Sequence, residues 1–466
     1  MNNYKIKGIL FFITAIVMMA ACRKRDAELP GLLVNFENSS QGITTGESFL
    51  EQRLVLSRVA EEDISISLKL SEQGVVHGTD YTTEPVAVSG NINLVIPAGS
   101  NAVSFRISKV NGILFDGDEK IFFDINSTGI PSQPGIKKQL TVGFEELIAK
   151  DATAVINGGG LLYPNKVFID LSASRETPVV RTAWDLGFYT GTDDFRVVLN
   201  SSSAMMAKQI NKNDLTQVTA ADTIGFSSDV AFSLFSPTTT SLPYIDYPTG
   251  DLTKTAIASV SSIESNNKVY IVNRGLGIGS PASARGWKKI RIIRNATGGY
   301  ILEQADIAAS TFTSIDIPKD EAYFFKYVSF ENGIVMVEPQ KKKWDIAWSY
   351  FSNVTNFGAG EVPYLYQDFI LINRNVQAAK VITGSIPFST FDSTHIGTVA
   401  FSSGQNVIGA DWRSGGGPTS GPAVRTDRYY IIKDGVGNYY KIRFTSLTKN
   451  GERGYPAYEV ILVKKG

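Results

Sequence analysis

Polar and apolar residues alternate along the first third of the chain. The alternation is clearest in Ile64–Leu70, Val103–Ile107 and Ile121–Ile125, which are separated by polar turns. A period of two residues places every second side chain on the same face of a β-strand. This pattern predicts a β-sandwich over residues 32–148, in which one face of each strand is buried.

The remaining chain repeats its own sequence. The segment Trp184–Phe188 (WDLGF) returns as Trp344–Trp348 (WDIAW). Each copy is followed at the same interval by a strand-like run and closes with a Lys-Ile-Arg segment. Three matches in the same order indicate a tandem duplication of a unit of about 160 residues. We place the two repeats at residues 150–315 and 316–466.

The composition fits strands throughout. The 466 residues include 19 Tyr and 26 Phe, and runs of Val, Ile and Thr lie between clusters of Gly, Asn, Asp and Pro, which is typical of an all-β protein. A chain of this length exceeds what one hydrophobic core usually serves, so several domains are expected. Lys plus Arg and Asp plus Glu number 45 each, which leaves no net charge to attract nucleic acid, and we exclude that partner.

The N-terminal residues have the features of a secretory signal. Lys5 and Lys7 precede an apolar run, and small residues lead to Cys22, the one cysteine of the chain. About 13 apolar residues are too few to cross a bilayer. The segment resembles a bacterial lipobox, which implies removal of residues 1–21 and acylation of Cys22. We therefore expect residues 22–31 to be a tether and the protein to be lipid-anchored in the outer membrane, at the cell surface.

Three local features of the first domain resemble a Calx-beta domain, namely Gly78–Tyr81, Ile96–Gly99 and Asp116–Glu119. The resemblance implies an immunoglobulin-like sandwich, and in that family acidic groups at one end often bind calcium. The family's acidic pair after the Val103 strand is replaced here by Lys109–Gly112, so a role as turn residues is the alternative. The candidate calcium ligands are the carboxylates of Asp80, Asp116, Asp118 and Glu119.

Each repeat combines an opening strand, the Trp-Asp motif, a tyrosine-rich strand and the closing Lys-Ile-Arg strand. In the second repeat, Arg428–Gly435 and Asn450–Gly454 extend the match into a C-terminal hairpin. Together these pieces resemble HmuY, a family of haem-binding surface lipoproteins of Bacteroidetes. The resemblance implies two HmuY-like β-domains in tandem that bind haem or a related planar ligand for uptake. An outer-membrane receptor or a host protein is then a further expected partner.

Haem in the family is held by paired histidines or, in some members, by paired methionines. This chain has two histidines, and only His395 lies in a repeat, so a histidine pair within one repeat is excluded. The resemblance therefore points to Met205 and Met206, adjacent soft ligands at the end of a polar run. Core packing from a short helix, 204–209, is the alternative for the two methionines. A surface turn is the alternative for His395.

The repeated Trp and Asp residues are expected to support the fold. A Trp in a strand buries a large apolar area, and the neighbouring Asp can accept hydrogen bonds from turn amides. Catalysis is not favoured, because the one cysteine is the acylation site and the two histidines lie in different domains. We predict a binding protein.

Aromatic and Gly-rich loops in the second repeat offer a different kind of site. Residues 353–360, 364–366 and 412–418 combine flat side chains with turns, which suit a porphyrin face or a sugar ring equally. An adhesive or glycan-binding scaffold without haem is therefore the alternative function. The sequence leaves open whether both repeats bind, and whether the two halves fold separately or pair strands into one domain.

Overall fold

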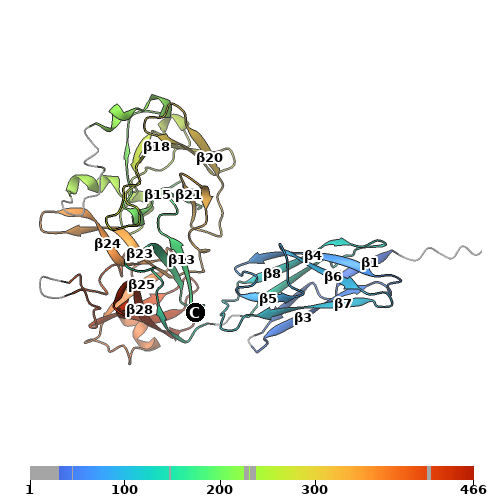
Figure 1. Cartoon of the computed structure of the whole chain (residues 1–466). Coiled ribbons are helices and arrows are strands. Elements are labelled where there is room, and N and C mark those ends of the chain that lie inside the picture. The colour runs from blue at the N-terminus through green and yellow to red at the C-terminus, as the bar shows by residue number, and fades with distance from the viewer. Residues whose placement is uncertain (1–30, 45, 146–147, 225–229, 231–237, 417–420) are drawn as a thin grey trace, which may run out of the picture. The chain divides into compact units, whose positions relative to one another are not determined.

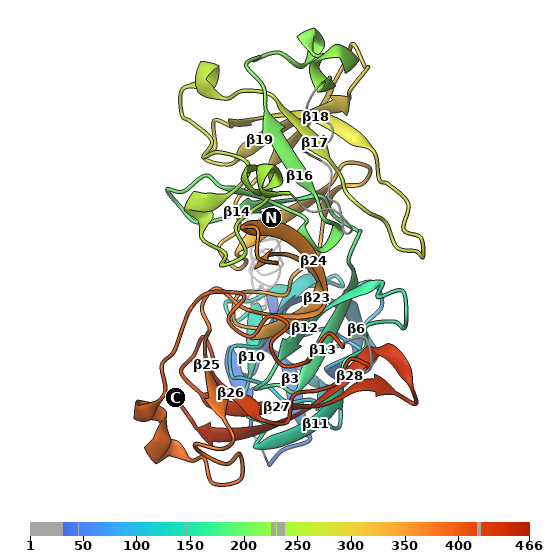
Figure 2. The same cartoon turned by 90° about the vertical axis from the view of Figure 1, so that its left-hand side faces the viewer.

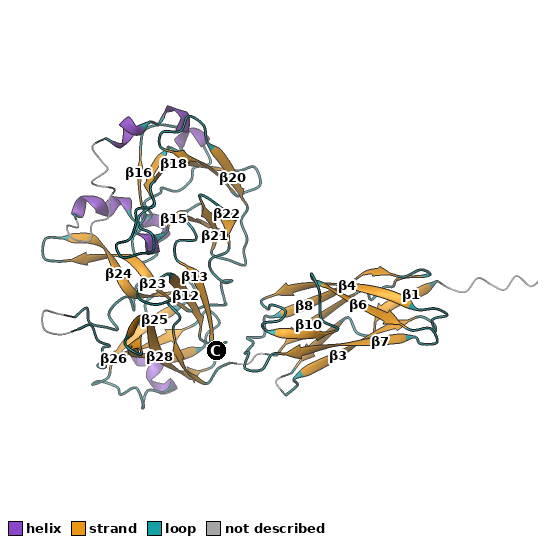
Figure 3. Ribbon diagram, in the orientation of Figure 1, coloured by secondary structure: helices purple, strands orange, loops and turns teal. Residues whose placement is uncertain are grey.

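The computed structural model describes residues 31–44, 46–145, 148–224, 230, 238–416 and 421–466. Cys22, the predicted signal peptide and all of the predicted tether except Gly31 lie outside these residues. The chain divides into two compact units, the second of which comprises Gly112–Gly117 and Glu146–Gly466. The predicted all-β fold is confirmed, because strands dominate both units and every helix among the described residues is a short 3-10 helix (Figure 3).

The first unit is a sandwich of two five-stranded sheets (Figure 1). One sheet has the order β5-β7-β3-β1-β9 and consists of β1 (Leu32–Phe36), β3 (Phe49–Leu56), β5 (Tyr81–Glu84), β7 (Ala102–Lys109) and β9 (Ser132–Pro134). The other has the order β2-β10-β8-β4-β6 and consists of β2 (Ser40–Ile43), β4 (Ile64–Gln73), β6 (Asn91–Ile96), β8 (Lys120–Thr128) and β10 (Gln139–Phe144).

The period of two in the sequence produces this sandwich directly. Along β3 the side chains alternate between exposed and buried, so that Leu50, Leu54 and Leu56 lie in the core. Phe105 of β7 packs on Phe123 of β8 with 5.1 Å between ring centroids, which joins the two sheets across the core. The unit therefore needs no disulfide to hold its sheets together.

The second unit contains four sheets. Two are β15-β14-β21-β22 and β16-β17-β18-β19-β20, formed by β14 (Leu186–Tyr189), β15 (Val197–Leu199), β16 (Met206–Gln209), β17 (Tyr270–Asn273), β18 (Trp287–Arg294), β19 (Tyr300–Asp306), β20 (Thr313–Ile317), β21 (Phe325–Ser329) and β22 (Gly333–Val335). The other two are β13-β12-β23-β24 and β11-β28-β27-β26-β25, formed by β11 (Asp151–Val155), β12 (Asn165–Asp170), β13 (Arg175–Val180), β23 (Ile346–Asn356), β24 (Glu361–Ile372), β25 (Gln377–Ile382), β26 (Arg428–Lys433), β27 (Tyr439–Lys449) and β28 (Glu452–Lys464). The connections carry η1 (Ser201–Ser203), η2 (Leu215–Gln217), η3 (Ala220–Thr223), η4 (Thr239–Tyr244), η5 (Leu252–Lys254), η6 (Glu264–Asn266) and η7 (Ser393–Thr398).

The two halves of this unit exchange their opening strands. The β12–β13 hairpin of the first half pairs with β23, the Trp-Asp strand of the second half, as Figure 2 shows. In return, the β21–β22 hairpin of the second half pairs with β14, the Trp-Asp strand of the first half. The strand before each hairpin pairs in the same sense. β11 pairs with β28 of the second half, and β20, which spans the boundary between the repeats, pairs with β19 of the first half.

The sequence left open whether the two halves fold separately or pair strands into one domain. The exchange shows that the halves pair strands. Because of the exchange, the second unit consists of two structural parts, an inner body and an outer body, that do not coincide with the two sequence repeats. The inner body is continuous and holds the two sheets formed between β14 and β22. The outer body is built from β11–β13 together with β23–β28, so that the inner body is inserted into it.

Candidate functional site

The Trp-Asp motifs hold the exchanged hairpins in place. The carboxylate of Asp185 accepts a hydrogen bond from Phe330 N at 2.9 Å, just beyond β21. The carboxyl group of Asp345 accepts one from Leu171 N at 2.8 Å, just beyond β12. The neighbouring rings pack on the same hairpins, with Trp184 edge-on to Tyr327 of β21 and Trp344 edge-on to Phe168 of β12.

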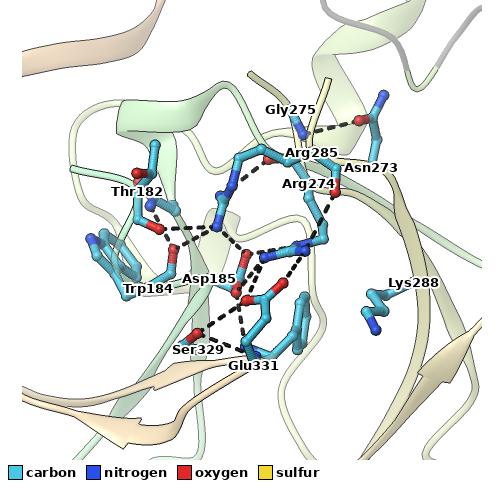
Figure 4. Close-up of polar contacts among 12 residues, drawn as sticks. Thr182, Trp184, Asp185, Asn273, Arg274, Gly275, Arg285, Lys288, Ser329 and Glu331 are labelled. Atoms are coloured by element: carbon cyan, nitrogen blue, oxygen red, sulfur yellow. Dashed lines mark hydrogen bonds and ion pairs between the residues drawn. The ribbon is translucent and has the colours of Figure 1, made fainter. Parts of the chain in front are cut away.

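The two Asp residues of the motif differ in their charged neighbours. Asp185, which is fully buried, pairs with Arg274 at 3.0 Å and with Arg285 at 2.8 Å (Figure 4). Arg274 also donates from Nη2 to Glu331 Oε2 at 2.9 Å. Burial opposes the charge on Arg274, but its bonds to the two carboxylates outweigh burial and raise its pKa.

Asp345 forms no ion pair with a cation among the residues that the structure describes. Burial raises the pKa of its carboxyl well above the ordinary value, and the nearby carboxyl groups of Asp170 and Asp434 add to the shift. The equivalent residue of the duplicated motif therefore lies between two arginines in the inner body, whereas burial and neighbouring carboxyl groups oppose its charge in the outer body. Both roles are structural, as the sequence analysis expected for this motif.

A surface pocket of about 620 Å³ lies beside the Asp185 cluster and is lined by Arg274, Arg285, Trp287 and Lys288, among others. Its cations already have carboxylate partners, since Lys288 pairs with Asp306 at 2.7 Å and the two arginines hold Asp185. The pocket therefore presents a balanced charge network, which does not favour an anionic or a cationic ligand.

A row of aromatic rings follows one face of the β23–β24 hairpin. Phe351 lies opposite Tyr366 and Asn353 opposite Tyr364 in the antiparallel register, so these side chains share a face. The centroids of Tyr364 and Tyr366 are 4.9 Å apart, and those of Phe357 and Tyr364 are 5.4 Å apart. Phe357 is 66% exposed and the two tyrosines are half-buried, so the row is open to solvent. Exposed aromatic surface of this kind commonly marks a binding site.

The two candidate methionine ligands lie in hydrophobic cores. Met205 packs with Leu186, Phe188 and other residues of the inner body, and Met206 packs in a second cluster with Leu215 and Val218. Their exposed fractions are 1% and 0%. The short helix expected at 204–209 does not form, because Ala204 adopts a left-handed conformation and β16 begins at Met206. Haem ligation by this pair stays a prediction that requires both side chains to leave their cores.

His395 lies in η7, where its ring Nδ1 is 2.9 Å from Asp392 Oδ1, as a surface turn would place it. Trp412, from the Gly-rich loop that was expected to line a cleft, is buried and donates from Nε1 to Asp368 O at 3.0 Å. It supports the fold. Residues 417 and 418 of that loop lie outside the described residues.

The four candidate calcium ligands are divided between the two compact units. Asp116 belongs to the second compact unit and lies 2.6 Å from Lys343 Nζ, whereas Asp80, Asp118 and Glu119 belong to the first unit. Asp80 accepts a hydrogen bond from Val76 N at 2.8 Å, as a turn residue does. No group of three His, Cys, Asp or Glu side chains in the described part of the chain is arranged to hold a metal ion. Calcium binding stays an untested prediction that this arrangement does not favour.

Among the described residues, no helix is long and apolar enough to cross a membrane. Solved structures similar to this chain include Calx domains. The apo form of the Calx CBD1 domain is 18% identical, with a TM-score of 0.21, and covers 24% of this chain and 96% of its own. The Calx CBD2 domain is 10% identical, with a TM-score of 0.21, and covers 24% and 86%. A two-domain protein of unknown function from Bacteroides fragilis is 9% identical, with a TM-score of 0.18, and covers 39% and 76%.

Scores this low support no argument about function, and none of the curated proteins matches the chain. The comparison with protein families, in contrast, identifies a family. The family described as HmuY protein matches residues 162–308 and again residues 323–460. Each match begins just before an opening hairpin; the first ends just after β19 and the second ends within β28. Since the two matches together cover more than half of the sequence, the chain belongs to the HmuY family, as two copies in tandem.

Proposed function

We propose that this chain is a non-enzymatic binding protein that holds haem or a related porphyrin against the aromatic row of the β23–β24 hairpin, for uptake. The proposal is carried by the exposed rings of Phe357, Tyr364 and Tyr366 on one face of a chain that belongs to the HmuY family. Aromatic rings stack on flat conjugated surfaces and bury apolar area without a covalent or metal bond. Binding through the ring face needs no axial ligand from Met205 or Met206.

Titration of the purified chain with haem tests this proposal. We expect a saturable change in the Soret region that Tyr364→Ala together with Tyr366→Ala weakens at least tenfold, since the loss of one stacking ring costs about 1 kcal/mol or more. Phe312→Ala, at an aromatic side chain that is 41% exposed in the inner body, is the matched control and should leave binding unchanged. Met205→Ala should lower the melting temperature and leave the haem spectrum as it is, because Met205 packs in a core.

Absence of a Soret change in both redox states would overturn the haem proposal. The alternative is a glycan-binding or adhesive surface that uses the same rings. It is favoured by Tyr364 and Tyr366, two half-buried side chains on one face of the hairpin whose hydroxyl groups can bond to sugar hydroxyls. Retention on a glycan array that is lost in the double tyrosine variant would support that alternative.

We propose further that Cys22 is acylated and anchors the protein in the outer membrane, facing the cell surface. The proposal rests on the apolar run and small residues that precede Cys22 in the sequence. Cells fed radiolabelled palmitate should label the wild-type chain, and Cys22→Ser should abolish the label and keep the precursor uncleaved. Labelling of the variant would contradict the proposal.

A further inference from the structure

A β-bulge interrupts the β23–β24 hairpin at the inner end of the aromatic row. The register shifts by one residue between Ser349 and Phe351, so that Gln367 and Asp368 of β24 both lie opposite Tyr350 of β23. Asp368 has a left-handed backbone conformation with a φ of +49°, which is uncommon for a residue other than glycine. The extra residue changes the face to which the neighbouring side chains of β24 point.

The bulge places rings on one face that a regular strand would separate. Tyr366 and Phe369 are three positions apart, and such residues point to opposite faces of a regular strand. Across the bulge, however, their ring centroids are 5.9 Å apart, and Phe351 stacks on Phe369 with 4.9 Å between centroids. The aromatic row therefore continues from the hairpin tip across the bulge.

Regular pairing would turn the tyrosines of the row to the other face. If the register of the hairpin base continued to the tip, Tyr366 would lie opposite Ser352, and Tyr364 would lie opposite Val354. That face of β23 packs on the inner body, because Ser352 Oγ donates to Ser201 O at 3.1 Å and Val354 packs against one of its core clusters. A slip of one residue would therefore point both tyrosines at the inner body.

The side chain of Asp368 is held by residues from other segments of the outer body. It is fully buried, and its Oδ2 accepts a hydrogen bond from Nη2 of Arg453 in β28. The Tyr163 hydroxyl donates to the same oxygen at 3.4 Å, and Nε of Arg413 lies 3.6 Å from it. These contacts fix the carboxylate, and with it the backbone of the bulge.

The backbone of the bulge is held by side chains as well. Asp368 O accepts from Nε1 of Trp412 at 3.0 Å, and Gln367 O accepts from Nη2 of Arg413. The side chain of Gln367 donates from Nε2 to the hydroxyl of Tyr350, the residue opposite the bulge, at 2.8 Å. Carbonyl groups that a regular strand would direct to its partner are thus satisfied by the loop that contains Trp412.

We propose that Asp368 is the positioning residue of the aromatic row, because the bulge that it holds selects the register in which Tyr364 and Tyr366 share a face with Phe351. The inference rests on the proposed function in taking this row as the ligand site. Aspartate suits the position, since its short polar side chain tolerates the left-handed conformation and its carboxylate is anchored there.

A matched pair of variants tests the proposal. Asp368→Gly and Asp368→Val both remove the carboxylate that pairs with Arg453, but glycine adopts a positive φ freely, whereas the β-branched valine does not. Each is made in the full chain with Cys22→Ser, which removes the one natural cysteine, and with either Leu365→Cys or Tyr366→Cys as the one thiol. The rate of thiol modification of the folded protein is measured.

With aspartate or glycine at position 368, the Tyr366→Cys thiol should react at least tenfold faster than the Leu365→Cys thiol, since Leu365 is 8% exposed and Tyr366 is half-buried. In Asp368→Val the order should reverse. Without the added cysteines, Asp368→Gly should bind haem within about twofold of the wild-type affinity, and Asp368→Val should bind it at least tenfold more weakly. Asp368→Ala replaces the valine variant if that variant does not fold.

The proposal fails if the folded Asp368→Val chain keeps the wild-type order of thiol reactivity, or if Asp368→Gly reverses that order as well. The thiol rates do not depend on haem. Reversal in Asp368→Val together with no haem binding by the wild type would therefore support the selected register and overturn the haem proposal. Haem binding with an unchanged order would do the opposite.

Discussion

Residues 182–340 should fold by themselves, whereas the sequence repeat 150–315 should not. The first fragment contains both sheets of the inner body and the whole Asp185 cluster. The second fragment contains β11–β13 without their partners β23 and β28, and it lacks the β21–β22 hairpin that completes the sheet of β14. Strands without partners expose unpaired backbone groups and an apolar face, so this fragment should aggregate.

The measurement is the dispersion of amide resonances together with size-exclusion chromatography. Fragment 182–340 should be a monomer with dispersed signals and a cooperative thermal transition. Its stability should be lower than in the whole chain, since it exposes Trp184, Phe325 and Tyr327, which share a core cluster with Trp344 and Phe168 of the outer body.

Mixing the two repeat fragments provides the control. Fragments 150–315 and 316–466 together contain every strand of the second unit, with β20 divided between them, so they should form a one-to-one complex on refolding, although neither folds alone. Independent folding of both repeats would show that the exchange of opening strands does not occur in solution.

Asp185→Asn and Asp345→Asn should have very different effects, although they change the same position of a duplicated motif. In the first variant, Arg274 and Arg285 stay buried without their carboxylate, a change that typically costs about 3–5 kcal/mol. In the second variant, the amide replaces a carboxyl group whose charge is opposed by burial and by neighbouring carboxyl groups, and its oxygen can still accept from Leu171 N. We expect a loss of about 1 kcal/mol or less.

The pH dependence of Asp345→Asn follows from the raised pKa of the Asp345 carboxyl. The folded protein binds this proton more tightly than the unfolded chain does, so the contribution of the group to stability is complete below about pH 3.9 and is lost as the pH rises toward its folded pKa. The amide does not titrate. The stability of Asp345→Asn relative to the wild type should therefore increase from about pH 4 upward.

Urea unfolding followed by tryptophan fluorescence measures both effects, because all five tryptophans lie in the second unit. Glu459→Gln, which removes a partly exposed ion pair with Arg443, is a control for the loss of one surface carboxylate. Equal losses in Asp185→Asn and Asp345→Asn would contradict the importance assigned to the two arginines that pair with Asp185.

Local sequence determined the strands of the sandwich, the duplication and the family of this protein. The period of two identified the strands of the sandwich, and the repeated Trp-Asp and Lys-Ile-Arg segments identified the duplication and the HmuY family, because side-chain alternation and short motifs depend on neighbouring residues only. The structural role of the Trp-Asp pair could also be predicted, since a strand Trp and its neighbouring Asp need the same kind of partners in any sheet.

The tertiary structure decided which partners those are. The two opening hairpins have similar patterns, so β12 and β21 suit either Trp-Asp strand locally, and only the packing of the complete chain selects the exchanged pairing. The same holds for Met205 and Met206. They follow a polar run in the sequence, which does not indicate that each packs in a hydrophobic core. It holds as well for Asp185 and Asp345, because the charged groups around a buried carboxyl group come from distant strands, which no local pattern records.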